Sequence, residues 1–233
     1  MSKSPTLADR LHKARTPSAP EVSDRAKRGL IAYLGAQPDT ARAAKDLADG
    51  TAATGIGRVA LSGLLPQGLA CADGCAFCCI LSGADGGTIT EAEAVGLHTA
   101  LAPLAGQPDG RAWHPKACPS LNPETRSCRA YEARPMICRS YVSTDVEACQ
   151  SVSEGQAVSG PGTLGPYHTY LAAIGLSRAA LKGVKRVSTY ALAEVAAAAV
   201  EGASLEDALA KARHKPTELD AELRRSKRDM SRV

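Results

Sequence analysis

The stretch Cys71-Ala-Asp-Gly-Cys75-Ala-Phe-Cys78-Cys79 holds four of the eight cysteines of this 233-residue chain within nine positions. Eight cysteines spread at random would place roughly 0.3 of a cysteine in such a window, so the cluster needs a chemical explanation. Thiolates are ligands for soft and borderline metals, and a chelating loop must return its sulfurs to one point. Gly74 permits the tight turn that this requires. The stretch therefore predicts a metal site.

The other four cysteines follow at a nearly regular spacing, with nine, nine and ten residues between them, as Cys118, Cys128, Cys138 and Cys149. Prolines at 119, 123 and 135 bound short loops that could fold these sulfurs back onto the first cluster. The count permits two four-sulfur sites, or one site with additional redox-active thiols.

The spacing within the first cluster separates three of its cysteines from the fourth. Cys71, Cys75 and Cys78 can share one centre, whereas the side chain of Cys79 is expected to diverge from its neighbour and to serve a second centre or a reactive role. Only the Cys75 to Cys78 pair has the C-x-x-C spacing that zinc sites use twice, and a three-cysteine loop completed by a distant fourth is typical of iron-sulfur clusters. Both iron and zinc stay open.

The cluster and the later segment Cys128-Arg-Ala-Tyr-Glu-Ala-Arg-Pro-Met-Ile-Cys-Arg-Ser-Tyr141 together resemble the CxxCxxCC, or YkgJ-type, cysteine-cluster family. The resemblance covers about residues 71 to 150 and implies a zinc- or iron-chelating domain with no settled biochemical activity. Three residues separate Cys71 from Cys75, where the family usually has two. The resemblance therefore supports Cys75 and Cys78 as ligands more firmly than Cys71.

We predict that the cysteines of this chain bind zinc or iron, and that iron could be held as an iron-sulfur cluster. The predicted ligands are Cys71, Cys75, Cys78, Cys79, Cys118, Cys128, Cys138 and Cys149. Arg134 and Arg139 flank Cys138. Their positive charges would offset the negative charge of nearby thiolates and lower cysteine pKa values. The alternative is that both form surface ion pairs with residues such as Glu132. His114 is a further candidate ligand.

Two enzymatic alternatives compete with a metal-binding module, and the sequence leaves open whether the chain is an enzyme. Residues 71–78 match the C-x3-C-x-aromatic-C loop of radical S-adenosylmethionine enzymes, but residues 80–233 supply few of the strand runs that their fold needs. Flagellin lysine methylases contain a similar cysteine cluster, yet no glycine-rich nucleotide loop is visible here, and residues 83–87 are more simply a turn.

The flanking sequence predicts a mainly α-helical protein with an irregular, loop-rich centre organised by metal. We predict an N-terminal helical region over residues 1–66, a cysteine-cluster domain over 67–155, and a C-terminal helical region over 156–233. Residues 55–69 contain a glycine-rich connection and a short apolar run. Whether residues 1–60 are ordered is left open.

Several helices are indicated by their patterns. Residues 21–34 carry one apolar stripe, and Asp39 can cap the next helix. Thr90 and Glu93 form a capping box. Two further helices are predicted over residues 167–185 and 187–203. Ser204 and Asp207 open a short helix that ends before Pro216, and Thr217 caps a last charged helix.

The composition indicates where the protein is located and which classes of partner to expect. The N-terminus lacks an apolar signal region and no stretch reaches the ~18 apolar residues of a membrane span, so we expect a cytoplasmic protein with no membrane partner. The net charge is only +4, the basic residues near the C-terminus are interleaved with acids, and aromatic residues make up 3%. These features argue against nucleic acid binding. A protein partner and the oligomeric state stay open.

Overall fold

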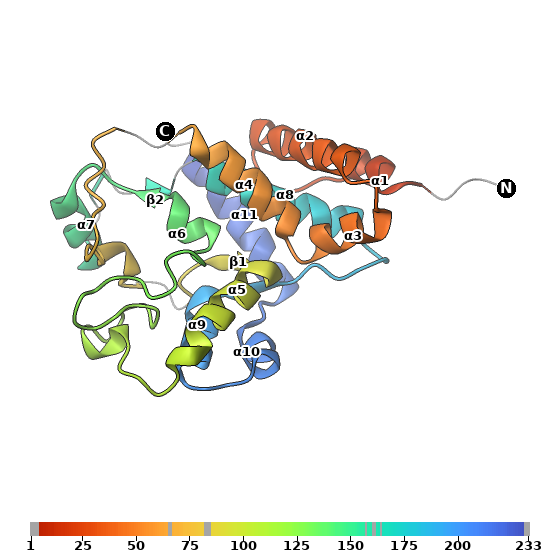
Figure 1. Cartoon of the computed structure of the whole chain (residues 1–233). Helices are drawn as coiled ribbons and strands as arrows, with labels where there is room; N and C mark the ends of the chain where they lie inside the picture. Colours follow the sequence, from red (N-terminus) through yellow and green to blue (C-terminus); the bar gives the residue numbers. More distant parts are fainter. Residues whose placement is uncertain are drawn as a thin grey trace. The chain divides into compact units, whose positions relative to one another are not determined.

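The computed structural model describes residues 5–64, 67–81, 85–156, 158–159, 162–163 and 165–230, and it is mainly helical, as predicted (Figure 1). The chain forms two compact units, each assembled from separate stretches of sequence. Unit 1 contains residues 1–63, 165–189 and 214–233, and unit 2 contains residues 64–164 and 190–213. Whether residues 67–155 form a domain of their own therefore stays a prediction. Within the described residues, no helix combines the length and the apolar character needed to cross a membrane.

Unit 1 is a group of helices packed around one almost fully buried helix, α8. Its helices are α1 (Leu7–Lys13), α2 (Pro20–Ala36), α3 (Thr40–Ala48), α4 (Thr51–Ser62), α8 (Gly165–Ala180) and α11 (Pro216–Met230). The first four and the last all contact α8. Alanines and glycine in α8 keep its surface small, so that neighbouring helices can approach it from several sides.

The patterns in the first part of unit 1 form as predicted. In α2 the stripe places Val22, Ala26 and Leu30 in the core. Asp39 caps α3, because its carboxylate accepts hydrogen bonds from the backbone N–H groups of the first turn. Residues 55–62, however, are not a connection but the second half of α4. Burial of one face of that helix outweighs the low helix propensity of its glycines.

Asp46 is a buried carboxylate in α3, with a side chain only 2% exposed. The Tyr33 hydroxyl donates a hydrogen bond to its Oδ2 at 2.5 Å, and Arg42 Nε donates to its Oδ1 at 2.9 Å. Burial, with the contribution of this carboxylate, raises the pKa of Tyr33. The three side chains thus connect α2 to α3 through one polar network.

Asp46→Ala is expected to lower the free energy of unfolding by about 1–3 kcal/mol, since it leaves the Tyr33 hydroxyl and the Arg42 guanidinium without their acceptor. Chemical denaturation followed by circular dichroism measures this loss. Asp24→Ala, at an exposed position on α2, is the matched control and should change stability by less than about 0.5 kcal/mol. Equal losses in the two variants would show that the buried network contributes nothing specific.

Unit 2 combines a small helical core with long loops. Its regular elements are η1 (Phe77–Cys79), β1 (Thr88–Thr90), α5 (Glu91–Leu101), η2 (Ala102–Leu104), η3 (Gly110–Ala112), α6 (Met136–Ser140), β2 (Tyr141–Val142), α7 (Val146–Ser153), β3 (Gly162–Thr163), the last two residues of β4 (Thr189–Ala191), α9 (Leu192–Val200) and α10 (Leu205–Ala212). β1 pairs with β4, and β2 pairs antiparallel with β3, with Tyr141 opposite Thr163. Helices α5, α9 and α10 contact one another and enclose the core.

The predicted capping box of α5 is present, because the Thr90 hydroxyl accepts from the Glu93 backbone while the Glu93 carboxylate accepts from the Thr90 backbone. The helix predicted over residues 187–203 is shorter than expected. Residues 189–191 form β4, and α9 begins at Leu192. Thr189 and Tyr190 favour an extended backbone, and their pairing with β1 replaces the first helical turns.

Candidate metal centre

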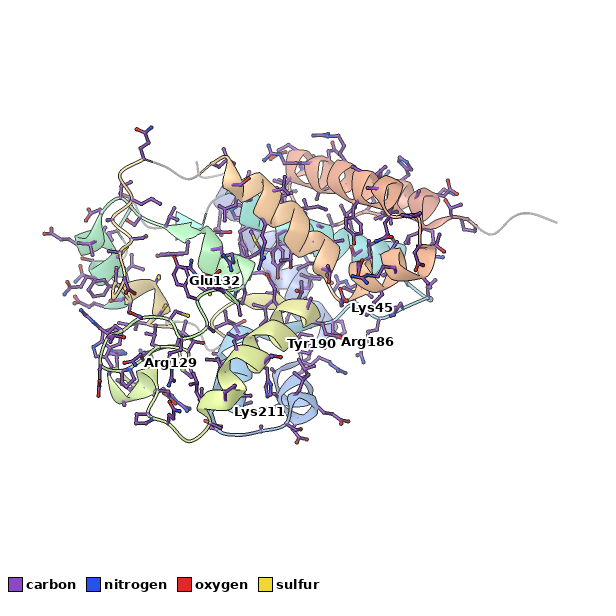
Figure 2. The ribbon with its side chains drawn as sticks, in the orientation of Figure 1. Lys45, Arg129, Glu132, Arg186, Tyr190 and Lys211 are labelled. Atoms are coloured by element: carbon purple, nitrogen blue, oxygen red, sulfur yellow. The ribbon has the colours of Figure 1, made fainter. Side chains whose placement is uncertain are left out.

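All eight predicted cysteines line a single cavity of about 520 Å³ in unit 2, and every one is a free thiol. They come from sequence positions as far apart as 71 and 149, and the loops between them fold back as the proline spacing predicted. Figure 2 shows Arg129 and Glu132 on the loops that surround this part of the molecule. The structure therefore brings all eight predicted cysteine ligands to one cavity.

The first cysteine loop is shaped by a tight turn and by one long-range hydrogen bond. Gly74 adopts a left-handed backbone with φ of 78°, the conformation that a glycine before Cys75 predicted. The Asp73 carboxylate accepts from the Gly74 N–H at 3.1 Å and from the Ser127 hydroxyl at 2.6 Å. This second bond holds the loop against the segment that carries Cys128.

The sulfurs of Cys78 and Cys79 lie 4.0 Å apart, within the short helix η1. Adjacent residues of a 3-10 helix are separated by about 120° around its axis, so the backbone directs the two side chains apart, as expected, and the side-chain conformations bring the sulfurs to this distance. Sulfurs bound tetrahedrally at about 2.3 Å from a zinc ion stand about 3.8 Å from one another. The distance therefore removes the reason for assigning the two cysteines to different centres.

Backbone hydrogen bonds hold the next two cysteines beside this pair. The Cys118 N–H donates to the Cys79 carbonyl at 2.7 Å, and Leu81 N–H donates to the Lys116 carbonyl at 2.8 Å. Residues Leu121 and Cys128 form an antiparallel bridge that brings the following loop alongside. Three stretches of chain are thus aligned by main-chain bonds.

Cys138 lies on α6, which begins directly after Pro135. The first backbone N–H of this helix, that of Met136, donates to Glu93 Oε1 at 2.8 Å. Glu93 is 7% exposed and belongs to α5, so one carboxylate both completes the α5 cap and anchors the helix that carries a predicted ligand. The sequence indicated the cap, but no local pattern signals the second bond.

The two arginines near Cys138 have different roles. Arg134 lines the cavity and stacks over the Tyr131 ring at 3.6 Å from its centroid. Arg139 donates to the backbone carbonyls of Arg134 at 2.7 Å and Glu132 at 2.5 Å, so it shapes the loop. The offset of thiolate charge predicted for both is therefore supported for Arg134 by its position in the cavity wall.

The cysteines form two groups according to which of them influence one another's pKa values. In the first, burial raises the pKa of Cys138, and Cys118, Cys128 and Cys78 raise it further. The pKa values of Cys118 and Cys128 are likewise raised by burial and by neighbours within this group. We call this set the inner group; its members are Cys78, Cys79, Cys118, Cys128 and Cys138.

The remaining cysteines form what we call the outer group: Cys71, Cys75 and Cys149. Burial raises the pKa of Cys149, and the charges of Cys75, Cys71 and, to a smaller extent, Cys78 of the inner group raise it further. The Cys71 thiol donates to the Ser143 carbonyl at 3.9 Å, which holds it near the loop before α7. The two groups therefore do not correspond to the two sets of cysteines in the sequence, because residues 71–79 contribute cysteines to both groups.

Within the inner group the thiols differ in acidity. A hydrogen bond from the Cys79 thiol, with a smaller contribution from the charge of Arg134, lowers the pKa of Cys78 to about 7. The same hydrogen bond and burial raise the pKa of Cys79. Because metal binds thiolate, loading the other buried thiols must release protons.

The donor chemistry of the cavity fits a soft or borderline metal ion. Among the described residues, no three Cys, His, Asp or Glu side chains already have the arrangement that would hold an ion. The eight cysteines therefore stay predicted ligands that share a cavity. His114 is not among the described residues that line it, and its Nδ1 accepts from the Lys116 N–H at 3.2 Å.

Gly110 is a further residue of this site that sequence reasoning missed. A Cβ atom added to it would stand 2.3 Å from the Cys118 carbonyl oxygen and 3.0 Å from the Leu121 Cβ. Only glycine allows this close approach of the two backbones. Nothing in the local sequence predicts it, because residues 110 and 118 meet only in the folded structure.

Gly110→Ala is expected to displace the Cys118 backbone and to lower the free energy of unfolding by about 1–3 kcal/mol, with reduced metal content. Gly96→Ala is the matched control, because a Cβ atom there meets nothing within 4 Å and lies inside helix α5. It should be neutral or stabilising by up to ~1 kcal/mol. Chemical denaturation and metal analysis of both proteins check this. A Gly110→Ala protein with wild-type stability and metal content would contradict the packing described.

The structure gives no support to the radical S-adenosylmethionine alternative. Over the described residues after Cys79, each strand is only two or three residues long, and no succession of strand and helix units follows the loop. Comparison with known proteins supports the cysteine-cluster resemblance. Residues 70–155 match the CxxCxxCC family model, described as "Putative zinc- or iron-chelating domain". No curated protein and no solved structure matches the chain.

Proposed function

Because residues 70–155 match the CxxCxxCC domain family, we propose that this chain binds zinc or iron through its cysteines. The observation that carries the proposal is the convergence of all eight free thiols on one cavity of about 520 Å³. Cysteines used only as small apolar core residues have no reason to gather from six loops and helices at one place. A shared donor role is the simplest reason for their position.

We assign the first ion to the inner group. Cys78 and Cys79 supply a sulfur pair 4.0 Å apart, and main-chain bonds hold Cys118 and Cys128 beside it. Cys138 is available from the anchored helix α6. The outer group has three thiols and would hold a second ion only with an additional donor, or would supply reactive thiols beside the first.

The chain's own residues suit this role in three ways. Four thiolates around a divalent ion leave a net negative charge, which Arg134 in the cavity wall offsets. Cys78, with its pKa lowered to about 7, is the inner-group thiol most readily ionised at neutral pH. The carbonyl and carboxylate anchors at Ser143 and Glu93 hold the surrounding loops.

A bound metal would supply one of two chemistries: zinc would cross-link the loops without redox change, whereas iron would also exchange electrons. Anaerobic purification followed by iron, zinc and sulfide quantification, with a visible spectrum, distinguishes them. Stoichiometric zinc without colour supports a structural site, and iron with equal sulfide supports a cluster. A protein with all eight thiols titratable and with neither metal would refute the proposal.

Eight free thiols also favour a reducing compartment, and we propose a cytoplasmic location. In an oxidising compartment, a sulfur pair 4.0 Å apart and a further cluster of thiols would form disulfides. Thiol titration of protein isolated under anaerobic conditions, with and without a chelator, tests this. Disulfides present before any exposure to air would argue against it.

A further inference from the structure

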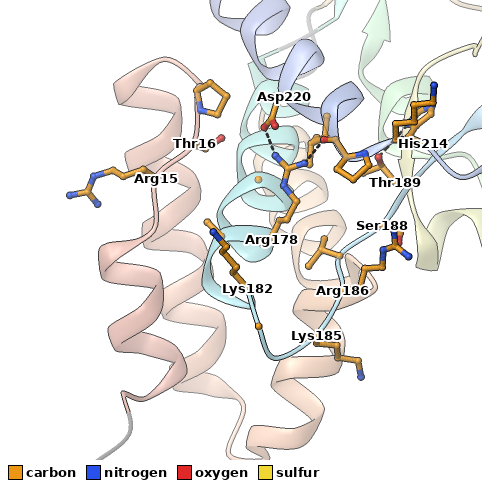
Figure 3. Close-up of a pocket in the computed structure, with 18 of the residues that line it drawn as sticks. Arg15, Thr16, Arg178, Lys182, Lys185, Arg186, Ser188, Thr189, His214 and Asp220 are labelled. Atoms are coloured by element: carbon orange, nitrogen blue, oxygen red, sulfur yellow. Dashed lines mark hydrogen bonds and ion pairs between the residues drawn. The ribbon is translucent and has the colours of Figure 1, made fainter.

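Unit 1 holds a second cavity, of about 700 Å³, and its walls are strongly cationic (Figure 3). Among the described residues, one acidic side chain, Asp220, and six Lys or Arg side chains line it: Arg15, Arg178, Lys182, Lys185, Arg186 and Lys215. The chain as a whole has 28 basic and 24 acidic residues, so this excess is local. We call this cavity the basic pocket. It lies entirely within unit 1 and shares no residue with the cysteine cavity.

The basic pocket is built on a defined backbone. Arg178 lies near the end of α8, where its guanidinium donates to the Pro216 carbonyl at 2.7 Å and pairs with Asp220. The chain then turns at Gly183, which has φ of 78°, so that Lys182 and Arg186 lie on either side of the turn. In Figure 3, Arg178 and Lys182 lie on α8 and the turn after it, while Arg15 extends away from them.

The ordinary explanation for such residues is that cations stabilise the negative C-terminal end of a helix. Here that role is already filled by Arg10, whose guanidinium donates to the carbonyls of Ala180 and Lys182 at 2.5 Å each. Among the described residues, Lys182, Arg186 and Lys215 have no acidic partner. Their charge is therefore not needed by the fold.

We propose that the basic pocket binds a small molecule that carries phosphate groups. Its volume falls in the range of small-molecule sites, and a concave cationic surface concentrates anions. Arginine provides planar donors suited to phosphate oxygens. The first turn of α11, with Pro216, also lines the pocket and adds the partial positive charge of a helix N-terminus.

The hydroxyl groups of the pocket fit the same ligand. Thr16 Oγ1 is buried with no hydrogen-bond partner among the described residues, and Ser188 and Thr189 line the wall beside Arg186. No Phe, Trp or Tyr occurs among the described lining residues, so the pocket offers no surface on which a base could stack. Recognition would therefore rest on phosphate, which favours a compact polyanion over a nucleic acid strand.

Titration calorimetry with tripolyphosphate at low ionic strength tests the proposal. We expect saturable one-to-one binding that weakens as salt rises. The triple variant Lys182→Ala, Arg186→Ala, Lys215→Ala should bind about tenfold more weakly, because three charge contacts are lost. The triple variant Arg25→Ala, Arg28→Ala, Arg58→Ala removes the same charge from exposed positions of unit 1 and should change affinity by less than about twofold.

Amine acetylation read by mass spectrometry gives a second, local measurement on the unaltered chain. Tripolyphosphate should slow labelling of Lys182, Lys185 and Lys215 but not of Lys45, which lies on α3 and pairs with Asp49. Absence of tripolyphosphate binding, equal weakening in both triple variants, or uniform protection of all lysines would overturn the proposal. So would binding of a single-stranded oligonucleotide with none of tripolyphosphate. These readouts do not depend on the metal, so their failure would leave the metal proposal intact.

Discussion

The Cys78→Ser, Cys138→Ser protein is expected to lose essentially all metal of the inner group. Cys78 has the most acidic thiol of that group, and the pKa of Cys138 is raised by burial and by the charges of Cys118, Cys128 and Cys78. Removing both leaves too few thiolates for a closed four-sulfur site. Because binding of a structural metal is coupled to folding, we also expect unit 2 to lose several kcal/mol of stability.

Metal analysis by mass spectrometry and thermal unfolding with and without a chelator measure both effects. Cys71→Ser is the matched control, because Cys71 is an exposed thiol of the outer group. It should retain the inner-group metal and most of the stability. In the wild type the chelator should lower the unfolding temperature, whereas in the double variant it should have no further effect. Unchanged metal content in the double variant would reject the assignment of ligands.

Glu93→Ala is expected to destabilise unit 2 by about 3 kcal/mol. The buried carboxylate accepts from the Thr90 N–H at 3.1 Å, the Thr90 hydroxyl at 3.2 Å and the Met136 N–H at 2.8 Å. Truncation leaves these donors unpaired in the interior. The first turn of α5 and the start of α6 should both loosen.

Denaturant unfolding gives the stability change, and hydrogen exchange at the amide of Met136 reports the local loosening. Glu124→Ala, at an exposed position of unit 2, should stay within about 0.5 kcal/mol of the wild type. Glu93→Gln should fall between the two, since an amide retains one acceptor oxygen. Metal affinity should fall with Glu93→Ala but not with Glu124→Ala, because only the first releases the helix that carries Cys138. Equal behaviour of all three proteins would refute the anchoring role.

Local rules predicted the elements that local forces determine. The capping box at Thr90 and the cap at Asp39 are sequence signatures of helix starts, and both are present. The stripe over residues 21–34 likewise fixes the buried face of α2. Where tertiary pairing competes with propensity, as in β4 at residues 189–191, the pattern misled.

The candidate site likewise has features that the sequence predicted and features that depend on long-range contacts. Cysteine spacing predicted which residues gather, and the cavity contains all eight. Their grouping depends on contacts between distant stretches, such as the Cys118 N–H bond to the Cys79 carbonyl and the approach of Gly110 to Cys118. The closeness of the Cys78 and Cys79 sulfurs depends on side-chain conformations that the order of residues does not determine. None of these could be inferred from spacing.

Unit 2 is assembled from two separate stretches of sequence, residues 64–164 and 190–213, and only the first contains the segment that matches the family. The family match ends at residue 155, but the core under the cysteine loops also contains residues from 190 to 213. Leu97 and Leu101 of α5 pack in one cluster with Leu192 and Val195 of α9. We expect a fragment cut at the family boundaries to expose these apolar faces to water, to lose their burial free energy, and therefore to aggregate or stay unfolded even when supplied with metal. The family match and the buried core of unit 2 thus have different boundaries in the sequence.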